Sequence, residues 1–70
     1  MADGRVARVT EVIAGSPVSF DAAIKLAFER ASATLRNITG MKVTEFKINC
    51  EEGQIKEYRV RLEVIFILEG

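Results

Sequence analysis

Residues 19–40 read SFDAAIKLAFERASATLRNITG, and this stretch decides the fold because it has both the length and the periodicity of a helix. Ser19 is suited to cap the first turn, since its hydroxyl can accept a hydrogen bond from an unpaired backbone amide. Gly40 is suited to the left-handed conformation that commonly ends a helix. The sequence therefore predicts a helix that ends at Gly40. Its apolar residues recur at helical spacing and form one stripe, namely Phe20, Ile24, Ala27, Ala31, Leu35 and Ile38.

Three β-strand patterns flank this helix, at residues 5–13, 41–50 and 55–69. Residues 1–4 are expected to be a disordered start, and residues 51–54 a turn in which Gly53 takes a positive φ. The predicted fold is α+β with the order β-α-β-β. A right-handed crossover makes the last strand central in a three-stranded antiparallel sheet, with the helix packed across one face. Residues 1–70 are expected to form a single domain.

Two irregularities in the strand patterns carry further information. Met41 and Val43 have one parity while Phe46 and Ile48 have the other, so either a β-bulge near Thr44–Glu45 realigns them or the strand is apolar on different faces at its two ends. In the last strand, Ile65 and Ile67 make one end apolar on both faces. A single helix covers one face, so the other is an exposed patch or, as we expect for so small a chain, a subunit contact.

The composition narrows the functional classes. The chain has 70 residues, ten basic and ten acidic, so its formal charge is zero and a broad basic nucleic-acid surface is not expected. One cysteine and no histidine argue against disulfides and structural zinc. A core this small rarely supplies more than roughly 3–5 kcal/mol, which leaves self-association as the expected source of stability. The apolar run at residues 64–68 is too short to span a bilayer, and no catalytic motif occurs. We expect a cytoplasmic, non-enzymatic protein.

Four pieces of sequence, in order and at matching spacing, resemble the dodecin family over nearly the whole chain. They are V-x-E-x-I-x-G-S-P at 9–17, E-R-A-S-x-T-L-R-N-I at 29–38, E-Y-x-V at 57–60 and F-x-L-E-G at 66–70. The resemblance implies the β-α-β-β fold and assembly into a hollow homododecamer. It also implies binding of a flavin, FMN or riboflavin, for storage or buffering rather than for catalysis.

Two positions depart from the flavin-binding pattern of that family. Gly40 stands where those dodecins carry a tryptophan that stacks on the isoalloxazine ring, and a glycine has no π-face. Arg59 stands where they carry a glutamine that bonds the ring edge, and an arginine offers only donors, in a charged fork suited to phosphate or carboxylate. The resemblance therefore leaves two ligands open, a flavin held by packing and charge, or another phosphate-bearing cofactor.

The expected ligand site comprises Gly40, Met41, Glu45 and Arg59 and is formed between subunits. Each residue also has a plainer interpretation: Gly40 as a helix cap, Met41 as core or interface, Glu45 as an exposed carboxylate, and Arg59 as the partner of a glutamate on a neighbouring strand. The identity of any metal is left unknown. The alternative function is a structural or ion-associated shell without an organic ligand. A third and weaker alternative is a small nucleic-acid-binding module that uses Arg5, Arg8, Arg59 and Arg61.

Overall fold

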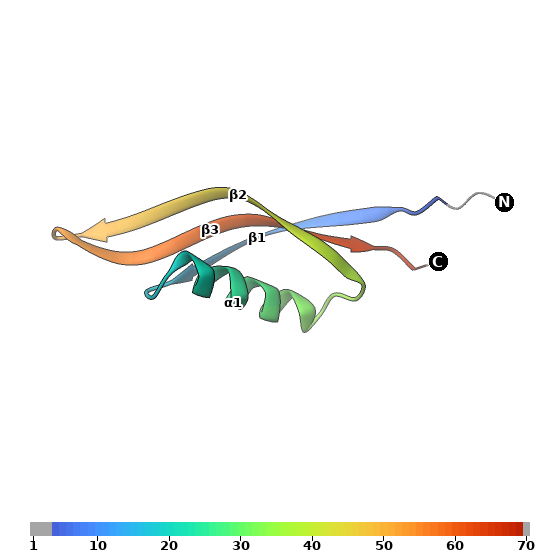
Figure 1. Ribbon diagram of the computed structural model, residues 1–70, viewed down its shortest axis with the longest axis horizontal. Helices are drawn as coiled ribbons and strands as arrows, with labels where there is room; N and C mark the ends of the chain where they lie inside the picture. Colours follow the sequence, from blue (N-terminus) through green and yellow to red (C-terminus); the bar gives the residue numbers. More distant parts are fainter. Residues whose placement is uncertain (1–3, 70) are drawn as a thin grey trace.

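The computed structural model describes residues 4–69, which form one helix and three strands (Figure 1). Along the chain these are β1 (Ala7–Ser16), α1 (Phe20–Ser32), β2 (Ile38–Glu51) and β3 (Gln54–Ile67). The predicted β-α-β-β order is confirmed. Most of the predicted disordered start, residues 1–3, lies outside the described residues.

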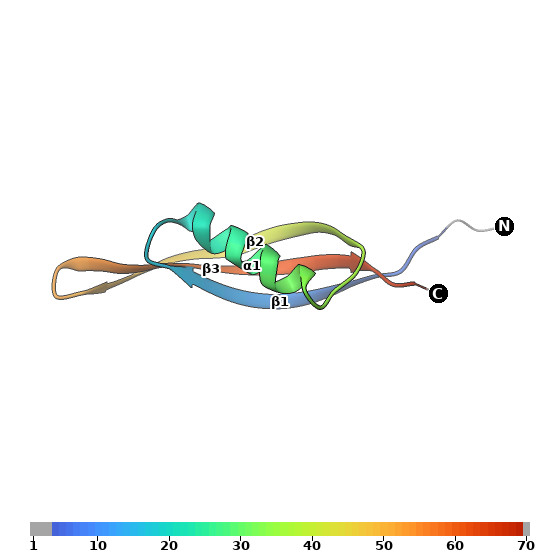
Figure 2. The same ribbon diagram turned by 90° about the horizontal axis from the view of Figure 1, so that it is seen from below.

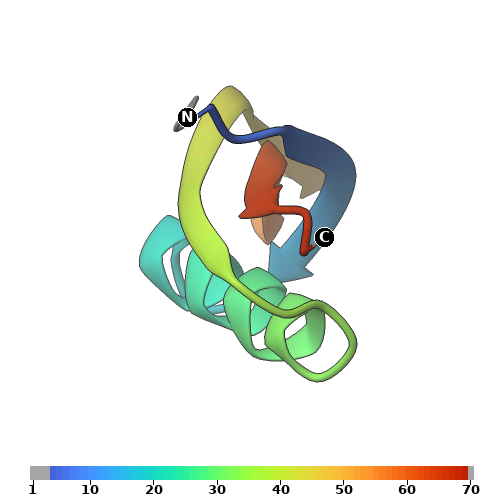
Figure 3. The ribbon, with the colours of Figure 1, turned by 90° about the vertical axis from the view of Figure 1, so that its right-hand side faces the viewer.

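The strands form one antiparallel sheet in the order β1-β3-β2, so the last strand is central as predicted. The register of β1 runs from Ala7 opposite Ile67 to Ser16 opposite Tyr58. α1 lies across one face of this sheet and leaves the other face uncovered, as the end-on view shows (Figure 3). We call the uncovered surface the outer face.

The helix begins as predicted but ends earlier. The Ser19 hydroxyl accepts a hydrogen bond from the amide of Ala22 at 3.0 Å, and Asp21 adds a favourable charge in the first turn. The last helical residue is Ser32, eight residues before Gly40. Residues 33–37 form a loop in which Asn37 has a φ of 61° and so takes the left-handed conformation expected of Gly40.

Gly40 is therefore not a helix cap but a residue of β2, opposite Ile65 of β3. The physical reason is that β-branched Ile38 and Thr39 are poor helix formers, and pairing with the central strand gives their backbone groups long-range partners. The prediction erred because such pairing is not visible in local periodicity. The other strands also differ at their ends, since β1 continues to Ser16 and β3 stops at Ile67.

The β-bulge is confirmed by a shift in the register of β2 against β3 between Val43 and Glu45. After this shift, Phe46 pairs with Val60 and Ile48 with Tyr58, which puts both apolar residues on the helix-covered face together with Val43. The Thr44 hydroxyl donates a hydrogen bond to the carbonyl oxygen of Arg61 at 3.1 Å across the bulge. The turn of the hairpin is also as predicted in kind, with φ of 53° at Glu52 and 76° at Gly53.

The core is a single layer of side chains between α1 and β3. Its buried members are three alanines of the helix and three aliphatic residues of the central strand, namely Ala23, Ala27, Ala31, Val60, Leu62 and Val64. Because alanine side chains are small, the helix axis can lie close to the sheet. Most of the remaining apolar residues are at the margin of this layer and are only partly covered.

The molecule is elongated, with extents of 60 × 20 × 13 Å. Its Cα radius of gyration is 14.9 Å, whereas a compact domain of this length has about 11 Å. The accessible surface of 5338 Å² exceeds the roughly 4,400 Å² of a compact monomer of this mass. The end of the β2–β3 hairpin accounts for much of this length, because it projects past the helix (Figures 1 and 2). Within the described residues, α1 is neither long nor apolar enough to cross a membrane.

We predict that Leu62→Ala lowers the free energy of unfolding by about 2–5 kcal/mol, because the fully buried side chain leaves a cavity beneath the helix. Urea denaturation at one fixed protein concentration measures the loss. Val18→Ala is the control, since Val18 is 73% exposed and its truncation should change stability by less than about 0.5 kcal/mol. Equal losses in the two variants would contradict the single-layer core.

Candidate functional site

The outer face carries a concentration of charge along the middle of the sheet. The pairing register puts four basic and four acidic residues on this face, namely Lys42, Lys47, Arg59 and Arg61 with Glu11, Glu45, Glu57 and Glu63. The charges of these eight residues cancel. This face therefore does not provide the positive field that non-specific nucleic-acid binding requires.

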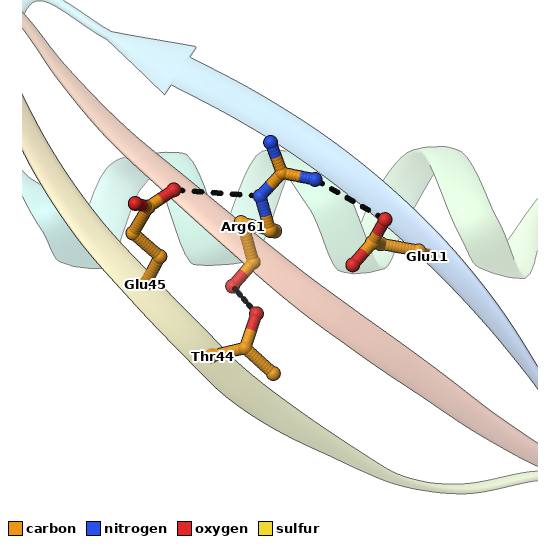
Figure 4. A network of polar contacts seen from close by, with 4 residues as sticks. All are labelled: Glu11, Thr44, Glu45 and Arg61. Carbon is orange, nitrogen blue, oxygen red and sulfur yellow. Dashed lines mark hydrogen bonds and ion pairs between the residues drawn. The ribbon is translucent and has the colours of Figure 1, made fainter.

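Arg61 joins all three strands through the network drawn in Figure 4. Its Nη1 lies 3.2 Å from Oε1 of Glu11 on β1, and its Nε lies 3.4 Å from Oε1 of Glu45 on β2. The three side chains are between 42% and 57% exposed. Ion pairs so open to water contribute only about 0–1 kcal/mol each, so an incoming anionic group can compete for Arg61 at little cost.

Arg59 is held more closely than Arg61, by Glu57 on the same strand. Oε1 of Glu57 accepts hydrogen bonds from Nε of Arg59 at 3.1 Å and from Nδ2 of Asn49 at 2.8 Å. Nη2 of Arg59 lies 2.9 Å from the same oxygen. Gly15 makes room for this cluster, because a side-chain carbon at that position would collide with the Glu57 carboxylate. Nη1 of Arg59 forms no hydrogen bond or ion pair within residues 4–69.

A small recess of about 70 Å³ lies between these groups, lined by Ile13, Glu45, Lys47, Arg59 and Arg61. Within the part of the chain that the structure describes, Lys47 has no ion-pair partner. Three cationic side chains and one carboxylate, that of Glu45, thus line a space of about the size of a small anion. Pockets that enclose a whole organic ligand measure about 300–1,000 Å³, so a larger molecule would extend beyond the recess and need further walls.

The four predicted site residues do not meet in one chain. Glu45 and Arg59 share the recess. Gly40 is on the same face, but its partner Ile65 is six residues from Arg59 along β3, which corresponds to about 20 Å. Met41 pairs with the buried Val64 and packs against the core on the opposite face. A pocket that combines Gly40 with Arg59 would have to take them from different protomers.

The surroundings of Gly40 are open. A side-chain carbon built at this position would have no atom within 4 Å apart from the neighbouring residues of the chain. Its φ is not in the left-handed region, so the backbone does not demand glycine here. The protomer therefore presents no steric barrier to a Cβ at this position.

Sequence reasoning missed the roles of Arg61, Lys47 and Ile13 in the recess. The bulge between Val43 and Glu45 brings Lys47 opposite Arg59 and Glu45 opposite Arg61, whereas Ile13 joins them because it pairs with Arg61 from β1. Choosing the bulge over the alternative interpretation identifies Lys47 as a neighbour of Arg59, but it does not identify Ile13. Within residues 4–69, no group of three or more potential metal ligands occurs in one chain.

Comparisons with known proteins agree with this architecture. The sequence model of the Dodecin family matches residues 6–69. Dodecin from Thermus thermophilus is 39% identical over 66 residues, which cover 94% of this chain and 96% of that protein.

Solved structures of dodecins are similar over nearly the full chain. Dodecin from Streptomyces coelicolor gives a TM-score of 0.92 at 38% identity and covers 99% of both chains. A calcium dodecin from Mycobacterium tuberculosis, described as a calcium-chelating antigen with a calcium-binding site, gives a TM-score of 0.80 at 32% identity over 91% of both chains. The extent of the family match, the identities and the shared fold show that this chain belongs to the dodecin family.

Proposed function

We propose that this protein is a homododecameric dodecin that binds and stores a small molecule, either a flavin or another phosphate-bearing cofactor, without catalysis. The observation that carries the proposal is the cationic recess on an uncovered sheet face, which suits the anionic part of such a ligand. Membership of the dodecin family supports a storage role and the number of subunits. A binding role also fits a sequence without histidine, the commonest general base.

Self-association is supported by the surface that one protomer leaves uncovered. On the outer face, Val9 and Ile13 are each 52% exposed, and Ile65 and Ile67 are only partly covered. This apolar end of the outer face adjoins the charged middle. Burying it against a second copy would bring additional walls to the recess, which is where a ligand larger than a phosphate group needs them.

Within this assembly, the ligand site would combine Glu45 and Arg59 of one protomer with Gly40 of another, while Met41 supports Gly40 from the core side of the same strand. Stacking on an indole is absent at Gly40, so charge and packing have to supply the affinity. The Nη1 group of Arg59, where Glu57 occupies the other side of the fork, the ammonium group of Lys47 and the weakly paired Arg61 are the donors available to a phosphate. A ligand with a phosphate should therefore bind better than the same ligand without one.

The alternative is an ion-associated shell without an organic ligand. The calcium-chelating M. tuberculosis relative favours this alternative. Glu11 and Glu63 lie directly opposite each other on β1 and β3, and carboxylates from two or more copies could together provide the six to eight oxygens that calcium prefers.

Native mass spectrometry of the protein purified from its own host distinguishes the two functions. Twelve subunits with a bound organic molecule would support the first and identify the ligand class. Twelve subunits that carry calcium and do not take up added FMN would support the alternative. A monomer at micromolar concentration would contradict both.

We predict that Arg59→Ala weakens FMN binding by roughly 10- to 100-fold while the oligomer persists, because one charge-assisted hydrogen bond to the phosphate is lost. Isothermal titration with FMN and with riboflavin measures the effect, which should be small for riboflavin because it has no phosphate. Arg36→Ala, which removes the same charge from the loop before β2, is the control. Unchanged FMN affinity in Arg59→Ala would exclude Arg59 from the site.

We predict that Gly40→Trp tightens flavin binding by up to about tenfold, because an aromatic pair contributes about 0.5–1.5 kcal/mol and the position is open. The natural sequence has no tryptophan, so quenching of the new indole fluorescence by added riboflavin reports stacking directly. Gly40→Leu is the matched control, since it fills space without a π-face. Equal affinities in the two variants would show that the isoalloxazine ring does not lie at this position.

A further inference from the structure

The end of the β2–β3 hairpin carries exposed apolar side chains that, beyond its base, are not covered by any other element within residues 4–69. We define the hairpin end as residues 46–58. Helix α1 begins beside the base of the hairpin end. There the ring of Phe20 lies 5.0 Å from the ring of Phe46 and 5.2 Å from the ring of Tyr58. Beyond this point, Ile48 and Ile55 are 45% and 52% exposed. A two-stranded hairpin is marginally stable by itself in water, so this one requires a packing surface.

A second unfilled surface lies at the edge of the sheet opposite to β2, between α1 and the unpaired edge of β1. We call it the edge groove. The volume of the groove is about 440 Å³. β1 contributes Val12 and Ala14 to its lining, and α1 with the loop after it contributes Leu26, Ala27, Arg30 and Thr34. β1 pairs with β3 alone, so its other edge has backbone groups without partners in the sheet.

The tip of the hairpin end is complementary in charge to the edge groove, although the hairpin end also carries the exposed Lys47 and Lys56 nearer its base. The tip of the hairpin end carries Glu51 and Glu52, both exposed. Arg30 of the edge groove is exposed and forms no ion pair within residues 4–69. From Ile48 to Glu51 is about 10 Å along a strand, and from Leu26 to Arg30 about 6 Å along a helix. The difference is within the reach of the long side chains, so an apolar contact and a charge pair can form together.

One chain cannot make this contact with itself. The edge groove is at the β1 edge of the sheet and the hairpin end contains β2, the opposite edge strand, with β3 between them. The hairpin also points away from the helix that forms the groove (Figure 2). The occupant of the groove must therefore be a second molecule, and the second copy of this chain offers the matching apolar residues and charges.

We propose that the hairpin end of one protomer packs into the edge groove of a second copy, with Glu51 and Glu52 facing Arg30. Such a contact joins two different surfaces, so each protomer can insert its hairpin end into one neighbour and receive the hairpin end of another. A closed ring forms when the rotation between successive protomers permits it. The inference rests on the self-association in the proposed function and adds the surfaces that meet.

Charge reversal tests the polar part of the contact. Arg30→Glu alone, and Glu51→Lys with Glu52→Lys, should each raise the concentration at which the oligomer dissociates by more than about tenfold, because like charges then face each other. All three substitutions in one chain should restore assembly. Glu29→Lys, a reversal on the same helix outside the groove, should change the concentration less than threefold. Native mass spectrometry over a dilution series measures these effects, and failure of the triple variant to recover would overturn the charge pairing.

A mixing experiment tests the apolar part and the direction of the contact. Leu26→Asp disables the groove and Ile48→Asp disables the hairpin end, so neither protein alone can make this contact. Mixed in equal amounts, they should form a heterodimer that keeps one intact groove and one intact hairpin end. Circular dichroism of each variant checks that it is folded.

The outcomes separate this inference from the proposed function. A monomeric parent protein would contradict the self-association itself. An oligomeric parent whose Leu26→Asp and Ile48→Asp variants assemble unchanged would leave the proposed function intact and overturn the hairpin-in-groove contact. Heterodimers formed only on mixing would support it.

Discussion

The close packing of three helix alanines on Val60, Leu62 and Val64 is the interaction on which the rest of the molecule depends. It produces a core one layer deep and covers one face of the sheet. The outer face, the edge groove and the hairpin end remain open as a direct result, because residues 4–69 contain one helix and it covers the other face. A fold of this kind can bury more of its apolar surface only by contact with other molecules.

Much of the fold could be predicted because the decisive signals are local. The Ser19 cap, the alanine-rich stripe, the turn at Gly53 and the alternation in β3 each act over a few residues. The helix end at Ser32 could not be predicted in this way. Ile38 and Gly40 pair with β3, which is more than twenty residues later in the sequence. Local periodicity does not show that these residues can form a strand with a distant partner in place of a further helical turn.

The candidate site could be predicted only in so far as it depends on which residues of each strand face the same side of the sheet. In the structure, the bulge in β2 puts Glu45 opposite Arg61 and Lys47 opposite Arg59. These four residues therefore line one recess. The prediction grouped its four site residues from the family resemblance and not from spacing, and in one protomer Gly40 lies at a distance and Met41 on the opposite face. Sequence spacing orders residues along a strand, whereas a site between protomers is a property of the assembly.

The pairing of Ala7 with Ile67 has a consequence for how the protein is made. The first and third strands are neighbours, and the fully buried side chains that the sheet contributes to the core, Val60, Leu62 and Val64, all belong to the third strand, β3. The hairpin of β2 and β3 closes a short loop, but the pairing of β1 with β3 closes a longer one that spans α1 and β2, which is the slower step. The core therefore cannot form during synthesis until β3 has emerged, whereas every residue that lines the edge groove has been made by Leu35. A nascent subunit thus has its groove residues before it has its core.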